Sequence, residues 1–108
     1  RYYTRVRISD IVYTDYSNHY IQVHTTDCVI RSHMSFDAFL PMLAPYANFL
    51  HCCRNCMVNM DYIESFGQKE FLLKNGERIQ IAAARRRDAV QKYADYIFDH
   101  YSKGVILP

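Results

Sequence analysis

The chain has 108 residues, of which 50% are hydrophobic and 15% aromatic, and its 13 Lys and Arg exceed its 11 Asp and Glu by a formal charge of +2. This composition excludes a disordered chain, and the small charge excess excludes a strongly basic, non-specific nucleic-acid binder. No apolar run reaches the roughly 18 residues of a membrane span, and the first residues lack the apolar core of a signal peptide. We therefore expect a soluble, cytoplasmic protein with no membrane partner. A second core would need roughly 50 residues of its own, so we expect a single domain over residues 1–108 with its core at about 5–98.

The first third of the chain is typical of short β-strands. Runs of β-branched and aromatic residues, separated by turn residues, predict strands at residues 4–8, 11–15, 20–25 and 28–32. Thr26 and Asp27 form a two-residue connection between the last two strands. Because Asp tolerates turn geometry, a tight hairpin is expected there.

A helical pattern follows at residues 35–43. Ser35 can cap the helix, and the apolar residues recur at helical spacing, namely Phe36, Phe39, Leu40 and Leu43. Pro41 and Pro45 constrain this helix, because proline removes a backbone donor and disfavours helical geometry in the residue before it. The helix should therefore be short, or distorted at Pro41.

Strands resume after this helix, at residues 49–54, 57–59, 62–66, 70–73 and 78–82. Asn75-Gly76 joins the last two strands, and this pair is a strong hairpin signal because both residue types accept positive φ. The pattern so far indicates a mainly β fold built of small antiparallel sheets.

A C-terminal helix is predicted over residues 84–101, and Gly104 is expected to end it. One face of this helix carries most of its apolar side chains, namely Val90, Tyr93, Ala94 and Ile97. The sequence therefore predicts two helices in all, one short and internal, the other C-terminal.

Catalytic signatures are missing from the sequence. It contains no Gly-rich phosphate loop, no GxSxG nucleophile elbow, no HExxH zinc motif and no informative pair of carboxylates. We therefore expect neither an enzyme nor a bound cofactor.

Four cysteines need an explanation of their own: Cys28, Cys52, Cys53 and Cys56. Their spacing does not fit a secreted disulfide framework, and a structural zinc site normally draws on two separated ligand pairs. We interpret the last three as reduced, buried or half-buried thiols on one strand. The alternative is a β-rich protein-interaction or redox- or metal-sensing domain that uses the Cys52, Cys53 and Cys56 cluster.

Polar side chains gather where loops are expected. These are residues 17–20, the pair Arg54-Asn55 and the run Arg85-Arg86-Arg87. All three carry donors suited to phosphates or base edges, although each is also explained by simple solvation of a surface loop. Cations at a helix N-terminus oppose the helix dipole, at a cost of up to about 1 kcal/mol, so the Arg run indicates an anionic partner.

Taken in order, these segments resemble the LytTR family. Residues 11–13 (IVY) and 18–25 (NHYIQVHT) are similar to its opening strands, and residues 49–59 (FLHCCRNCMVN) to its hallmark segment, commonly F-x-R-x-H-R-S-x-x-V-N. Tyr62-Ile63, the hairpin at residues 72–77 and Ile79-Gln80-Ile81 before a basic helix start continue in the family's order. The resemblance covers residues 7–98.

The resemblance implies stacked small antiparallel sheets and sequence-specific binding of double-stranded DNA. Family members insert loops into successive major grooves and bend the DNA, usually at direct-repeat sites. They are bacterial transcription regulators, often output domains of two-component response regulators. The implied partners are thus duplex DNA, an N-terminal receiver domain outside this chain and a second copy of the chain on DNA.

Carried over residue by residue, the resemblance implies that His19 and Arg54 contact DNA, together with Arg85 or Arg86. Weaker candidates are Asn18, Asn55 and Lys69, and Arg86 and Arg87 would serve phosphates.

The chain departs from the family pattern at several of these positions. Cys53 stands where His is usual, His51 where Arg is common, and Asn55 where Ser is common. Residues 82–84 (AAA) replace a Ser followed by Arg. This last departure leaves open whether Ala84, Arg85 or Arg86 holds the third contact position.

Overall fold

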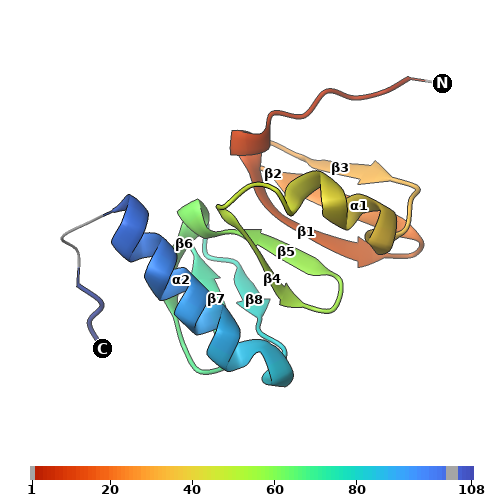
Figure 1. Ribbon diagram of the computed structural model, residues 1–108. Helices are drawn as coiled ribbons and strands as arrows, with labels where there is room; N and C mark the ends of the chain where they lie inside the picture. Colours follow the sequence, from red (N-terminus) through yellow and green to blue (C-terminus); the bar gives the residue numbers. More distant parts are fainter. Residues whose placement is uncertain (1, 102–104) are drawn as a thin grey trace.

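Two antiparallel sheets and two helices make up the fold (Figure 1). The computed structural model describes residues 2–101 and 105–108. The larger sheet has the strand order β3-β2-β1-β5-β4 and the smaller one β6-β7-β8. Their strands are β1 Ile11–Ser17, β2 Tyr20–Thr25, β3 Val29–Ser32, β4 Phe49–Cys53, β5 Cys56–Asn59, β6 Ile63–Phe66, β7 Glu70–Leu73 and β8 Arg78–Gln80. The helices are α1 Phe36–Leu43 and α2 Arg86–His100, and short 3-10 turns occupy Ile8–Asp10, Met60–Tyr62 and Ala83–Arg85.

The mainly β prediction is confirmed, but the first expected strand is wrong. Residues 4–7 form no regular element, and Ile8–Asp10 is a 3-10 turn closed by a bond from the amide of Asp10 to the carbonyl of Arg7 (3.0 Å). The physical reason is that this segment cannot form a hairpin with β1, the strand that follows it, because β1 already pairs with β2 on one edge and β5 on the other. Other strand ends differ from expectation by one or two residues.

The C-terminal helix forms as expected, although its buried face is rotated. Tyr93 is buried, but the other buried residues are Ala89 and Tyr96. Three residues assigned to that face are only half-buried, namely Val90, Ala94 and Ile97. The expected end of the helix at Gly104 lies outside the described residues.

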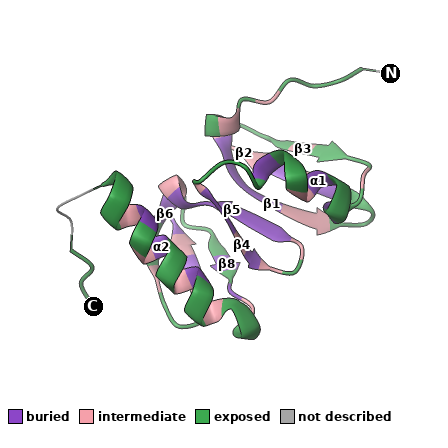
Figure 2. Ribbon diagram, in the orientation of Figure 1, coloured by how far each residue is buried: buried purple, intermediate pink, exposed green. Residues whose placement is uncertain are grey.

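The larger sheet divides the core into two layers (Figure 2). Successive residues of a strand point to opposite faces. Met57 and Phe49 therefore pack with α1, while Val58 and Leu50 face the smaller sheet and α2. Because both faces of β4 and β5 are covered, these strands are almost continuously apolar, as their burial confirms.

Helix α1 is short, as expected from its prolines. The Oγ of Ser35 caps it by accepting from the amide of Ala38 (3.1 Å), and Pro41 lies inside its eight residues. Its buried side chains are Phe36, Phe39 and Leu43. Their i, i+3 and i+7 spacing places one stripe against the larger sheet.

The side chain of Asn59, the last residue of β5, connects this strand to the start of β1 and to the residues on either side of β4 and β5. Its side chain is 1% exposed, and its Nδ2 donates to the carbonyl of Ile11 (2.9 Å). Its Oδ1 accepts from Nδ2 of Asn48 (3.1 Å) and from the amide of Asp61 (3.0 Å). A buried amide satisfied in this way is costly to replace, because each partner would lose its own bond.

Side-chain bonds also join the two sheets. The hydroxyl of Tyr13 donates to Oε2 of Glu77 (2.6 Å), and that of Tyr62 donates to the carbonyl of Ser9 (3.0 Å). Burial, and next the bond to Glu77, raises the pKa of Tyr13 above its ordinary value, so its hydroxyl stays a neutral donor.

Within residues 2–101 and 105–108, neither helix has the length and apolar character needed to cross a bilayer.

Thr14 provides a test of the packing. It is fully buried between Val23 and Met57, and its Oγ1 has no hydrogen-bond partner among the described residues. Thr14→Val removes this buried hydroxyl while keeping the branched shape. We expect a gain of about 1 kcal/mol in the free energy of unfolding, measured by urea denaturation.

Thr25→Val is the matched control. There the Oγ1 accepts from the amides of Cys28 (3.0 Å) and Asp27 (3.2 Å), so the same substitution should cost about 1 kcal/mol. A Thr14→Val protein that loses as much stability as Thr25→Val would show that Thr14 has a partner in solution.

Candidate functional site

The tips of two hairpins lie at the same end of the larger sheet (Figure 1). Asn18-His19 joins β1 to β2, and Arg54-Asn55 joins β4 to β5. Strands β1 and β5 are antiparallel, with Tyr13 opposite Val58, so the end of β1 lies beside the start of β5. Two strand spacings separate the tips, which is roughly 10 Å.

The β1–β2 tip is a tight two-residue turn. Asn18 has φ 52° and His19 φ 68°, the positive pair of a type I′ turn, and Ser17 pairs with Tyr20 below it. Asn and His occupy this left-handed region more readily than most residues. Both side chains are exposed, so the turn presents two polar groups at a fixed place on the surface.

The β4–β5 tip is held by the side chain of His51. Cys53 pairs with Cys56 below the tip, and Nε2 of His51 donates to the carbonyl of Arg54 (3.0 Å). The His51 ring also packs against Phe36, with ring centroids 5.3 Å apart. Arg54 is exposed and Asn55 half-buried. The backbone of the tip is thus anchored to α1, while the guanidinium of Arg54 projects into solvent.

The start of α2 is attached beside β4. The amide of Ala82 donates to the carbonyl of Cys52 (3.0 Å), and the amide of Ile81 donates to the carbonyl of Lys69 (2.8 Å). These bonds bring the Arg run and the β6–β7 turn to the end of β4 that carries Arg54. Arg85, Arg87 and Lys69 are exposed, whereas Arg86 is half-buried.

All the residues singled out from the sequence therefore share one margin of the molecule, here called the polar edge. It comprises Asn18, His19, Arg54, Asn55, Lys69, Arg85, Arg86 and Arg87. Along it the order is the β1–β2 tip, the β4–β5 tip and the start of α2, because β4 is the outermost strand on that side.

The cations of the polar edge are not neutralised by neighbours. Ion pairs join Lys92 to Asp88 (3.2 Å) and Arg78 to Glu70 (3.5 Å). In the described part of the chain, no ion pair involves the Arg or Lys residues of the polar edge. The start of α2 adds the positive end of a helix dipole, so this margin favours anions.

Sequence reasoning missed a cluster next to the β1–β2 tip. The guanidinium carbon of Arg31 lies 4.8 Å from the ring centroid of Tyr20, whose ring is 5.3 Å from that of His33. All three are exposed, and the pairing of Ile21 with Ser32 brings them together. Each residue alone looked like part of an ordinary strand end, so only the pairing of β2 with β3 reveals the cluster.

The cysteine cluster is also different from expectation, because it spans two strands. Cys52 and Cys53 are on β4, Cys56 is on β5, and their three Sγ atoms lie within 4.8 Å of one another. The turn at Arg54-Asn55 folds Cys56 back opposite Cys53. Hydrogen bonds with Cys52 and Cys56 lower the pKa of Cys53, whereas hydrogen bonds with Cys52 and Cys53 raise the pKa of Cys56. Cys28 lies apart and is exposed.

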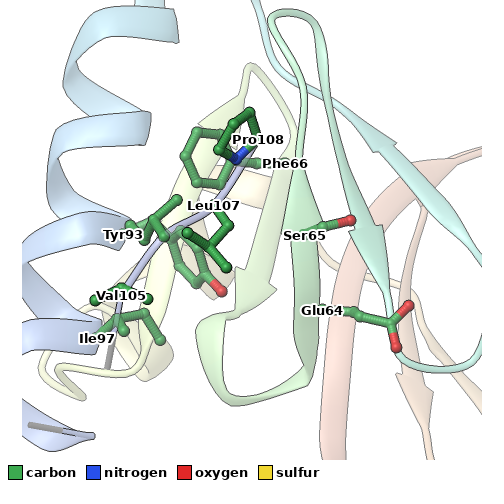
Figure 3. A pocket seen from close by; sticks show the side chains of 9 residues that line it. Glu64, Ser65, Phe66, Tyr93, Ile97, Val105, Leu107 and Pro108 are labelled. Carbon is green, nitrogen blue, oxygen red and sulfur yellow. The ribbon is translucent and has the colours of Figure 1, made fainter. Parts of the chain in front are cut away.

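Two cavities lie away from the polar edge. One of about 320 Å³ lies between β6, α2 and residues 105–108, where Tyr93, Ile97 and Leu107 supply apolar walls (Figure 3). The other, of about 770 Å³, lies between residues 2–8, α1 and β3. None of the eight residues of the polar edge lines either of these two cavities.

Comparisons with known proteins found one matching family model and a similar solved structure. A family model described as the LytTr DNA-binding domain matches residues 2–93. A similar solved structure is the LytTr DNA-binding domain of a putative methyl-accepting/DNA response regulator from Bacillus cereus. It shares 21% identity over 87% of this chain and 83% of that chain, with a TM-score of 0.62, which shows a common fold. No curated protein matches the chain.

His51→Phe tests the anchoring of the β4–β5 tip. Phe keeps the ring packing on Phe36 but removes the bond to the carbonyl of Arg54. Loss of about 1 kcal/mol of local stability should speed hydrogen exchange of the Cys56 amide about fivefold. The Tyr20 amide at the other tip is the internal control. Equal acceleration at both amides would mean general destabilisation and would contradict a local role.

Proposed function

Because the chain belongs to the LytTR family of DNA-binding domains, we propose that it binds duplex DNA sequence-specifically through the polar edge. In this proposal it is the DNA-reading part of a bacterial transcription regulator. The observation that carries the proposal is the meeting of four separate polar segments at one end of the two sheets. Their cations have no acidic partners within the described residues.

The two hairpin tips would read bases. Arg54 presents a guanidinium fork, which pairs bidentately with the O6 and N7 atoms of guanine in the major groove. Asn18 and Asn55 carry amides suited to adenine, and His19 donates to a base or a phosphate. The rigid turn at Asn18-His19 and the His51 anchor below Arg54 reduce the entropy lost when these side chains bind.

The start of α2 would hold the phosphate backbone. Arg85, Arg86 and Arg87 stand at a helix N-terminus, where backbone N–H groups and the helix dipole also favour an anion. Nε of Arg86 is buried without a hydrogen-bond partner in the described residues. Lys69 and Arg31 would extend this contact toward the two ends of the edge. Such contacts position the protein on DNA without reading its sequence.

The geometry of the edge also suggests how the duplex lies. The tips are roughly 10 Å apart, close to the width of about 12 Å of one major groove, so they would address neighbouring base pairs. A duplex bent toward the protein would bring a successive groove to the start of α2. A second copy on a direct repeat, and a receiver domain that supplies the signal, complete the proposed regulator.

The runner-up is a redox- or metal-sensing domain. The observation that favours it is the convergence of the Cys52, Cys53 and Cys56 thiols. This cluster lies below the Arg54 tip, so the two functions are compatible in one molecule.

Arg54→Ala tests base readout. We expect a loss of about 1 to 3 kcal/mol in binding free energy, with relaxed preference at one position of the site. Arg54→Lys should keep the charge but lose the fork, and so lose specificity more than affinity. Binding sites selected from random duplexes at fixed salt, followed by titration of each variant, provide the measurement. His19→Ala should act in the same way but more mildly. A loss that is equal for cognate and scrambled duplexes would remove Arg54 from the readout.

Arg87→Ala tests the phosphate contact. It should weaken binding to all sequences alike and lower the slope of log K against log salt by about one. Arg78→Ala is the matched control, because it removes the same charge from a residue outside the polar edge whose guanidinium is already paired with Glu70 (3.5 Å). If Arg78→Ala and Arg87→Ala changed the slope equally, the effect would come from net charge alone and the polar edge would lose its support.

A further inference from the structure

We propose that Cys52, Cys53 and Cys56 form a three-thiolate site for a soft metal ion of the copper(I) class. Their Sγ atoms lie within 4.8 Å of one another. Bonds of about 2.3 Å from sulfur to metal place three sulfurs about 4 Å apart around one ion. The side chains therefore need to move by less than about 1 Å to enclose it.

A local irregularity of β4 brings the three sulfurs together. Consecutive residues of a regular strand point to opposite faces, which would separate Cys52 from Cys53. The register of β4 against β5 shifts between His51 and Cys53, as in a β-bulge, and this re-aims the side chains. The Sγ of Cys52 then lies 3.9 Å from the carbonyl oxygen of Cys56, while Cys53 is directly opposite Cys56.

Coordination number favours copper(I) over zinc. In the described residues, no further His, Cys, Asp or Glu joins the three sulfurs. The nearby His51 ring donates its Nε2 to the carbonyl of Arg54. Zinc would need a fourth ligand, and water is a poor one here because Cys52 is 0% and Cys56 5% exposed. Soft thiolates select copper(I), which accepts three of them without water.

Access to the site is through Cys53. It is half-buried, whereas the other two cysteines belong to the core between the larger sheet and α2. An ion would displace the thiol protons, and its own charge would stabilise the thiolates in this apolar setting. The competing explanation is that the thiols only pack as small hydrophobic groups, which predicts no affinity for metal.

Metal binding would also affect the β4–β5 tip, which lies next to the three cysteines. Cys53 and Cys56 flank Arg54-Asn55, so an ion between them would fix the base of the tip that carries the Arg54 guanidinium. This consequence rests on the proposed function, whereas the metal site itself does not.

The experiment is an anaerobic titration of the reduced, full chain with copper(I) delivered by a coloured chelator such as bicinchoninate. We expect one copper per chain, and X-ray absorption should show three sulfur neighbours. Stoichiometric zinc binding with no copper binding would overturn the assignment to copper(I). Absence of both would overturn the site. DNA is not needed for this measurement, so its outcome is separate from that of the DNA-binding tests.

Two matched variants locate the ion. Cys53→Ser, at the half-buried position, should lower copper affinity more than about 100-fold, since loss of an outer-shell partner alone costs 10- to 100-fold. Cys28→Ser, at the exposed cysteine outside the cluster, should bind as the unchanged chain does. Equal behaviour of the two variants would contradict the proposal.

A measurement on the unchanged chain covers the case in which Cys53→Ser fails to fold. Copper(I) should protect Cys53 from alkylation, read by mass spectrometry, while Cys28 stays reactive with and without metal. Unprotected Cys53 in a chain that holds one copper would place the ion elsewhere and overturn the proposal.

Discussion

The pairing of β1 with β5 is the constraint on which the rest of the structure depends. It joins the two halves of the chain into one sheet, and Asn59 secures it by donating to the carbonyl of Ile11, 48 residues earlier. A shift of one residue in this register would turn each buried side chain of β1 to the opposite face of the sheet. The same register aligns the two hairpin tips, so the β1–β5 pairing positions both the buried core residues and the polar edge.

The two hairpin tips differ in how their exposed polar groups are held in place. At Asn18-His19 the backbone itself is fixed, by two positive φ angles that leave little freedom. At Arg54-Asn55 a side chain, His51, holds the backbone from below. Both devices suit a surface that must meet a stiff partner such as a duplex. The second tip also differs in having three cysteine side chains gathered at its base, Cys52, Cys53 and Cys56.

Much of the fold could be predicted because its signals are local. The strand at residues 20–25 and the position of the hairpin at Asn75-Gly76 follow from alternation and turn residues within a few positions, although only Gly76 has a positive φ (91°). Residues 4–8 show the limit of such reasoning, since their composition suits a strand but both edges of β1 are already taken. The helix α2 was placed correctly, yet Ala89 and Tyr96 are buried in place of the neighbours expected, because packing against the sheets selects the face.

By itself, the sequence determined where the strands lie from residue 11 onward, where the polar turns fall and which family the residues resemble. Only the tertiary structure decided that Asn18-His19, Arg54-Asn55, Lys69 and the Arg run lie on one margin, and that Arg31 and His33 lie beside them. It alone brought the sulfurs of Cys52, Cys53 and Cys56 together across two strands. The physical reason is range: backbone propensity and side-chain periodicity act over a few residues, whereas strand order and register depend on bonds between residues far apart in the chain.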